Sequence, residues 1–416
     1  MTSSGLGYLF AGRAIRSFMQ SYLAVVVPLY LLYRGFSPFA IGVLVTCAAG
    51  TGALLSVLAG FAADRYGRKV VLITLSLAGA AAGALFALNG PYAALVAAGA
   101  LGSIGRGGGA ASGGAFGPYY PAEQALLAER IADHRRTALF GMFSFVGVIA
   151  GALGSLVSAA PEVALRFRLT TRGGGYDAVF WLTAALGLVL AASVLPIPES
   201  RAARRPAQSQ APLSARTRRL LVRLGATNAT NGLAVGFLGP ILTLWFHLRF
   251  GAGEVQIGTL FFLMNLVGAV PYLHISRIVR MVGGAVRTIV SVRIIACVLL
   301  AVVPFMPTFW TAGALYLVRM LFNVISLPVR QSFVMGVVPP EERSRVAGLS
   351  NFPAQVLQMV GPAMAGAMFE NFWIGAPLLL ASALQLVNAG LYWTFFRGVL
   401  PPEEQKLMRP PVPGRS

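Results

Sequence analysis

The chain has 416 residues, of which 56% are hydrophobic and only 11% charged, and its formal net charge is +20. A soluble globular protein carries roughly 25% charged residues, so this composition excludes a chain that meets water over most of its surface. The positive charge alone would suit a nucleic-acid-binding protein, but its distribution along the chain argues for a membrane protein.

Twelve apolar segments, each long enough to cross a bilayer as a helix, follow one another along the chain. The second segment has a clear start, because Ser37 can cap a helix there and Pro38 fits the first turn. The fold class is therefore an all-α polytopic membrane protein. We expect helices at approximately 7–33, 38–62, 69–89, 92–120, 137–160, 178–196, 220–247, 254–275, 286–306, 309–335, 345–369 and 373–396.

The basic residues lie mostly on one side of these predicted spans. Segment 198–219, between the sixth and seventh helices, is rich in arginine and proline, and most other Lys and Arg fall in loops on the same side. This asymmetry follows the positive-inside rule and predicts a multi-pass protein of the cell membrane with both termini in the cytoplasm. We therefore expect the lipid bilayer, and not nucleic acid, as its partner.

The two halves of the chain resemble each other. A duplicated six-helix bundle is typical of secondary transporters whose solute site lies between the halves. We predict an N-terminal bundle, a cytoplasmic linker, a C-terminal bundle and a cytoplasmic tail, at 1–197, 198–219, 220–398 and 399–416. At an offset of about 212 residues, the paired features are Pro28 with Pro240, Asp64-Arg65 with Ser276-Arg277, and Arg106 with Arg319.

The loop after the second predicted helix carries the most specific motif. It reads Gly60-Phe61-Ala62-Ala63-Asp64-Arg65-Tyr66-Gly67-Arg68-Lys69, and this pattern resembles the signature loop of the major facilitator superfamily. The resemblance implies twelve helices in two bundles related by pseudo-two-fold symmetry, which move a small solute by alternating access. It also implies that Asp64 latches the cytoplasmic gate against helix 11; the alternative is an ordinary charged loop. The predicted gating loop consists of Gly60, Asp64, Arg65, Gly67, Arg68 and Lys69.

Two further motifs resemble those of the drug and metabolite exporters of this superfamily. Arg106, in the glycine-rich fourth helix, is similar to their arginine-centred motif. The glycines of the fifth and eleventh helices, such as Gly151, Gly154 and Gly361, resemble their antiporter motif, although close helix packing explains these glycines as well. The resemblance favours an efflux-type permease with its site between helices 1, 4, 7 and 10.

Arginines inside the predicted helices favour a different solute. Arg13 and Arg16 lie one turn apart on helix 1 and share a face, while Arg319 is the counterpart of Arg106. A guanidinium stays charged and needs an anion, a carboxylate or water beside it within a membrane. For the helix 1 pair the alternative is snorkelling to the headgroups. The other candidate substrate-binding residues are the amides Asn228, Asn231 and Asn323.

Carboxylates are missing from the middle of every predicted helix, although the chain has 13 Asp and Glu. Proton-driven transporters usually use an intramembrane carboxylate that binds and releases the proton. Glu123, at the end of the fourth predicted helix, is the nearest candidate for a coupling residue, and we expect it on the cytoplasmic side.

The sequence carries no enzyme signature. Cys47, Cys297 and the 3 histidines have no spacing typical of a metal site or a catalytic triad. We therefore predict no catalytic activity, no metal and no cofactor. The predicted function is secondary transport of a small organic solute by a monomer, of efflux type, with a proton as the candidate coupling ion. The alternatives are transport of an anionic solute (an organic acid or a phosphate-like compound) and lipid translocation.

Overall fold

The computed structural model describes the backbone of residues 4–102, 118, 119, 123, 136–196, 214–239, 241–268, 279, 281, 282, 284–338 and 342–398. Every regular element in this part of the chain is a helix. Nine stretches of helix here are long and apolar enough to cross a membrane, and two shorter apolar helices accompany them. The prediction of an all-helical polytopic protein is confirmed.

The contacts divide the chain into two compact units. Unit 1 comprises Met1–Gln208, Gly236–Ala269 and Met359–Pro377, and unit 2 comprises Ser209–Val235, Val270–Gln358 and Leu378–Ser416. Most of the predicted linker and all of the predicted tail lie outside the described residues. The six-and-six division at 198–219 therefore stays a prediction.

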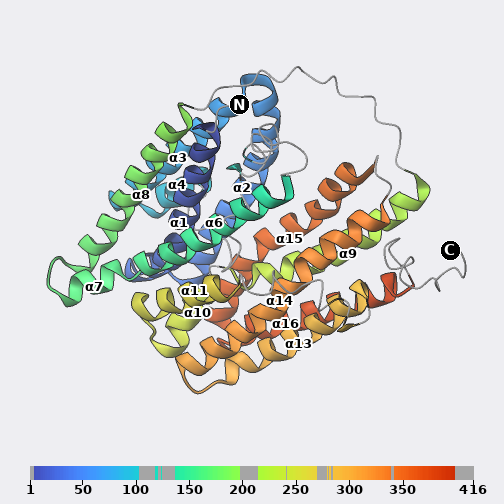
Figure 1. Ribbon diagram of the computed structural model, residues 1–416. Coiled ribbons are helices and arrows are strands. Elements are labelled where there is room, and N and C mark those ends of the chain that lie inside the picture. Colours follow the sequence, from blue (N-terminus) through green and yellow to red (C-terminus); the bar gives the residue numbers. More distant parts are fainter. Residues whose placement is uncertain are drawn as a thin grey trace, which may run out of the picture. The chain divides into compact units, whose positions relative to one another are not determined.

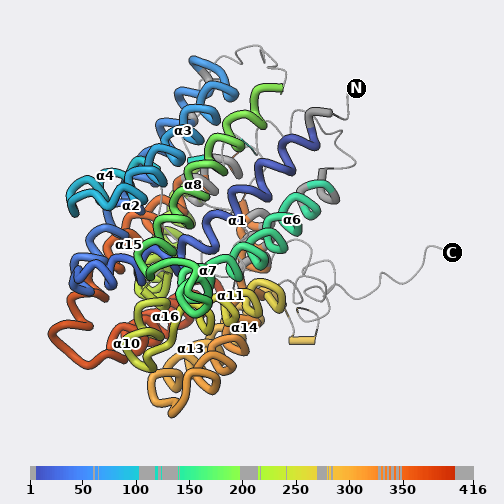
Figure 2. Tube along the Cα trace, turned by 90° about the vertical axis from the view of Figure 1, so that its left-hand side faces the viewer, coloured from blue at the N-terminus to red at the C-terminus, as the bar shows by residue number. Residues whose placement is uncertain are grey.

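Unit 1 is built around the first helix. Figure 2 shows α3, α8, α1 and α6 lying side by side in that order, and each pair of neighbours is in contact. Aromatic side chains from three of them meet in the core, where the rings of Phe86 and Phe180 pack against Tyr30. The helices of unit 1 are α1 (Ser4–Tyr33), α2 (Pro38–Tyr66), α3 (Arg68–Ala87), α4 (Tyr92–Gly102), α6 (Arg136–Val157), α7 (Ala160–Arg166), α8 (Arg172–Val194), α10 (Ile241–Phe250), α11 (Glu254–Gly268) and the last part of α15 (Arg343–Asn371).

Unit 2 contains α13 packed along α14 (Figure 1). Their shared core includes Val292, Phe333 and, from the last helix, Tyr392. The helices of unit 2 are α9 (Ala215–Gly236), α13 (Ala285–Val302) with the 3-10 turn Val303–Phe305 after it, α14 (Phe309–Val337), the first part of α15 (Arg343–Asn371), and most of α16 (Ala376–Phe396).

The observed start of α2 agrees with the sequence prediction, and the observed start of α8 differs from it. Ser37 caps α2 as predicted, because its hydroxyl accepts a hydrogen bond from the Ala40 N–H at 3.3 Å. The predicted start of the sixth helix at 178 is wrong, since Thr171 caps α8 by accepting from the Gly174 N–H at 3.2 Å. The extra turns bring Arg172 onto this helix.

A glycine of α6 sets its distance from α1. A Cβ added at Gly154 would meet the backbone of Phe18, so no side chain fits there. Helices in lipid gain little from hydrophobic association and rely on close contact, which small residues permit. Gly154 therefore acts as a packing residue, in agreement with that interpretation of the fifth-helix glycines.

The same helix offers a matched pair of substitutions. Gly154→Ala should lower the free energy of unfolding by about 1–3 kcal/mol through overpacking. Gly141→Ala should be neutral or stabilise by up to about 1 kcal/mol, because no atom lies within 4 Å of a Cβ at Gly141. Unfolding of both purified variants in detergent checks this. Equal stability of the two variants would contradict the close α1–α6 contact.

Candidate functional site

Helix α1 carries two buried arginines toward the interior of unit 1. Arg13 and Arg16 are only 1% and 3% exposed. The guanidinium carbon of Arg13 lies 5.2 Å from the centre of the Phe143 ring, on α6. Because both side chains are enclosed by protein, the snorkelling interpretation is wrong, and the prediction that the two share a face toward the interior remains.

Arg16 forms an ion pair with Glu123. One guanidinium nitrogen, Nη2, donates to the Glu123 Oε2 at 2.6 Å, and the other, Nη1, donates to Oε1. The Arg16 guanidinium also stacks against Tyr119, with its carbon 5.0 Å from the ring centre. Both charged side chains are buried. Glu123 thus lies inside unit 1 against α1, a position that the sequence alone did not indicate.

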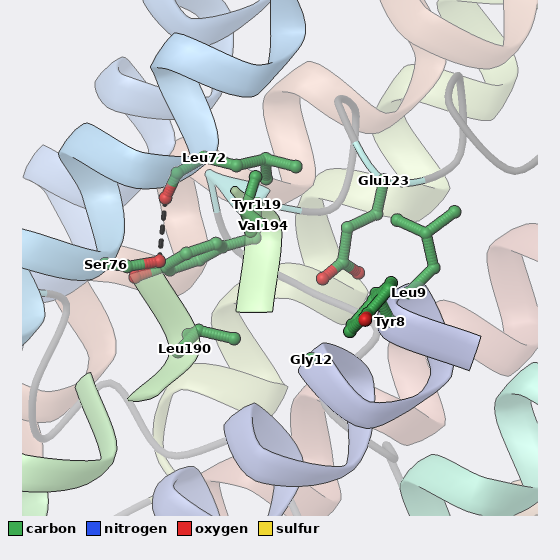
Figure 3. A pocket seen from close by; sticks show the side chains of 9 residues that line it. All are labelled: Tyr8, Leu9, Gly12, Leu72, Ser76, Tyr119, Glu123, Leu190 and Val194. Carbon is green, nitrogen blue, oxygen red and sulfur yellow. Dashed lines mark hydrogen bonds between the residues drawn. The ribbon is translucent and has the colours of Figure 1, made fainter. Parts of the chain in front are cut away.

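Two small pockets adjoin this ion pair. The first is lined by Glu123 together with Ser76 and Tyr119, as Figure 3 shows, and its other walls are mainly apolar. The second pocket is lined by Arg16 and Gln20 and shares Ser76 and Tyr119 with the first. The ion pair therefore has its acid in the wall of one pocket and its base in the wall of the other.

The candidates of unit 2 make polar contacts within that unit. The Arg319 Nη2 donates to the Gln385 Oε1 at 3.3 Å, and the Asn228 Nδ2 donates to the Ser350 carbonyl at 2.7 Å. Asn231 accepts a hydrogen bond from Arg293. The carbonyl of Asn323 accepts from the Ser326 hydroxyl at 2.9 Å.

Sequence reasoning did not single out Arg293, although the signal was available. It lies inside a predicted helix, as Arg319 does, but it has no arginine counterpart in the first half. In unit 2 its Nη2 also donates to the Ser326 hydroxyl at 3.3 Å. Arg293 thus joins α9, α13 and α14.

The comparisons with known proteins identify the family. The family model of the Major Facilitator Superfamily matches residues 9–352. The chain belongs to the Major Facilitator Superfamily. It is therefore a membrane-embedded secondary transporter that acts on small molecules, and not an enzyme.

Relatives and solved structures of this superfamily match most of the chain. An uncharacterized membrane protein of Saccharomyces cerevisiae is 21% identical and covers 95% of each chain. The multidrug resistance protein MdtG of Serratia proteamaculans is 24% identical over 67% of this chain and 68% of its own. The nucleoside transporter NupG gives a TM-score of 0.71 at 16% identity, covering 93% and 100% of the two chains. A D-xylose–proton symporter gives a TM-score of 0.67 at 14% identity, and the match covers 94% of this chain and 98% of the symporter.

The solved structures confirm the superfamily's fold of two helical bundles for this chain. The predicted gating loop is partly described. Gly67 separates α2 from α3 with a φ of 98°, a backbone conformation that favours glycine. Lys69 donates to the Leu195 carbonyl, and Arg65 lies over the ring of Tyr66. The side chain of Asp64 lies outside the described residues.

The remaining predicted residues lie in helices or outside the described part of the chain. Gly60 belongs to α2 and Arg68 begins α3. Arg106 lies outside the described residues, so its predicted role as a substrate-binding residue stays a prediction. In the part of the chain that the structure describes, no group of three or more His, Cys, Asp or Glu side chains could hold a metal ion.

Proposed function

We propose that this transporter is proton-coupled and of efflux type, with Glu123 as the residue that takes up the proton. The single observation that supports this proposal most is the buried ion pair of Glu123 with Arg16. Ionisable groups inside the membrane part of a protein are costly and usually serve transport. Glu123 is also the carboxylate that the sequence marked as the nearest coupling candidate.

The chemistry of the pair supplies a switch. The ionised Glu123 carboxylate accepts two charge-assisted hydrogen bonds from Arg16, the strongest arrangement for these groups. A protonated carboxyl has lost its charge and one of its acceptor sites, so it releases Arg16. The freed guanidinium then faces the second pocket with an unmatched charge. Protonation of Glu123 would therefore change the charge that the second pocket presents to a solute, which couples proton binding to solute binding.

The proposal also includes the direction of transport and the membrane in which the protein lies. Export is supported by the names of the distant MdtG relatives, which are multidrug resistance proteins. Location in the cytoplasmic membrane with both termini inside is supported by the positive-inside pattern. In the same proposal the loop from Gly60 to Lys69 acts as the cytoplasmic gate, and the transporter works as a monomer.

Glu123→Gln tests the proposal directly. In proteoliposomes that contain a trapped pH-sensitive dye, a panel of organic acids and lipophilic cations should include compounds that move protons through the wild-type protein. With Glu123→Gln the same compounds should move no more protons than protein-free liposomes do. Their exchange across the membrane, followed with labelled compound, should persist because the amide keeps the size of the carboxyl group and cannot titrate.

Glu342→Gln is the matched control, since Glu342 is a partly exposed acid of unit 2 that accepts from the Ser214 N–H at 2.9 Å. This variant should keep wild-type proton movement. Proton movement at the wild-type rate through Glu123→Gln would show that another group couples transport to protons.

A further inference from the structure

Unit 2 holds buried positive charge without an acid. Arg293 and Arg319 are 5% and 3% exposed, and they lie in the interiors of α13 and α14. The sequences of α9, α13, α14 and α16 contain no Asp or Glu. No carboxylate of these helices can therefore neutralise them, in contrast to Arg16, whose charge is matched by Glu123.

The contacts of these arginines are all with neutral groups in the described residues. Arg293 donates to the amide of Asn231 and the hydroxyl of Ser326, and Arg319 donates to the amide of Gln385. The Nε atoms of both arginines find no hydrogen-bond partner among the described residues. Each guanidinium group thus has one N–H donor, at Nε, that no described residue accepts from.

The two arginines lie in the same part of unit 2. Arg293 interacts electrostatically with both Arg330 and Arg319. Cys297, one turn after Arg293, likewise interacts with Arg293 and Arg319. Like charges repel one another strongly where water is excluded, so an anion among these cations would stabilise them.

A buried hydroxyl points to the same place. The Tyr392 hydroxyl on α16 has no hydrogen-bond partner among the described residues, and its residue is fully buried. Tyr392 interacts electrostatically with Arg330 and Arg293. Buried polar groups are almost always hydrogen-bonded, so an orphaned hydroxyl beside orphaned guanidinium donors indicates an absent acceptor.

We propose that unit 2 binds a small anion, a carboxylate or a phosphate group, through Arg293 and Arg319, with the Tyr392 hydroxyl as an additional donor. Guanidinium groups bind both kinds of anion in planar, two-point geometry. The proposal rests on the proposed transport function in one respect, since it assigns the exported solute to the organic or phosphorylated anions. Exchange of an exported anion for a proton carries positive charge inward, which an inside-negative membrane potential favours.

The test is binding of labelled phosphate and labelled succinate to the full-length protein in a neutral detergent, at constant ionic strength with chloride as the balancing ion. Wild type should bind at least one of them saturably. Arg319→Gln should weaken that binding by about tenfold to a hundredfold, as expected for loss of a charge-assisted hydrogen bond. Arg249→Gln removes an exposed arginine and should bind as wild type does.

Tyr392→Phe is a second test variant, which keeps the proposal testable if the arginine variants do not fold. It removes only a hydroxyl without a described partner, so the protein should fold normally and bind the anion several-fold more weakly. Absence of saturable binding to the wild type would overturn the proposal, and so would unchanged binding by folded Arg319→Gln and Tyr392→Phe.

A second arm distinguishes a free solute from a lipid headgroup. Nanodiscs of phosphatidylglycerol and of phosphatidylcholine present the protein with and without an anionic headgroup. Binding of labelled succinate or phosphate that is equal in both supports a free solute. Binding that is lost only in phosphatidylglycerol would assign the anion site to the headgroup and overturn its assignment to the solute.

Glu123→Gln separates this proposal from the proposed function. It should still bind the anion saturably, while proton movement is lost. Proton movement that depends on Glu123, together with no anion binding by the wild type, would leave the coupling proposal standing and remove the anion site alone.

Discussion

Arg16→Ala should lower the free energy of unfolding by about 3–5 kcal/mol. The substitution leaves the Glu123 carboxyl buried without the cation that now holds both of its oxygens. The carboxyl must then stay charged in an apolar interior or take up a proton, and either course costs free energy. The loss of the stacking contact with Tyr119 adds to this cost. Equilibrium unfolding of the purified protein in mixed micelles measures the effect.

The double variant identifies the pair as the cause. Arg16→Ala with Glu123→Gln should be more stable than Arg16→Ala alone, because the amide carries no charge that needs a partner. Arg249→Ala is the control, since this exposed arginine should contribute within about 0.5 kcal/mol. If Arg16→Ala proved as stable as Arg249→Ala, the buried ion pair would not exist in the protein.

Arg172→Ala should lower the free energy of unfolding by about 2 kcal/mol. Its partner Glu254 is fully buried on α11, where it also accepts from the Tyr176 hydroxyl. The Arg172 Nη2 donates to the Glu254 Oε1 at 3.1 Å, but its side chain is 39% exposed, so solvent screening keeps the effect below that of Arg16.

The contacts of Glu254 with Arg172 and Tyr176 join α8 to α11, which are distant in sequence. Glu162 on α7 supports this connection, because its Oε2 accepts from the Val255 N–H at 2.9 Å. Arg166→Ala is the matched control, since Arg166 is an exposed arginine on α7. A loss as large in Arg166→Ala as in Arg172→Ala would mean that the ion pair does not hold these helices together.

Helices were predictable from apolar length because a bilayer demands runs of about twenty apolar residues. The positions of the helix ends were harder to predict from the sequence. The sixth helix was predicted to start at 178, yet the Thr171 cap starts α8 ahead of Gly173, Gly174 and Gly175. The short helix α7 was also missed, because its seven residues are too few for a periodic pattern. The Arg172–Glu254 pair therefore could not be anticipated.

Contacts between residues that are distant in sequence could not be predicted either. Sequence reasoning selected Arg16 and Glu123 separately, one as a solute ligand and the other as a coupling residue. They are 107 positions apart, and no local rule joins residues at that distance. Arg293 was missed for a related reason, because the comparison of the two halves drew attention only to arginines with a counterpart.

Infrared difference spectroscopy of the purified protein, between acidic and alkaline buffer, tests the central claim that Glu123 binds the transported proton. Wild type and Glu342→Gln should gain the carbonyl stretch of a buried carboxylic acid on acidification and lose the matching carboxylate bands. Glu123→Gln should lack that pair of changes. Identical difference spectra for the wild type and Glu123→Gln would mean that Glu123 does not titrate, and the proton would then have to bind elsewhere.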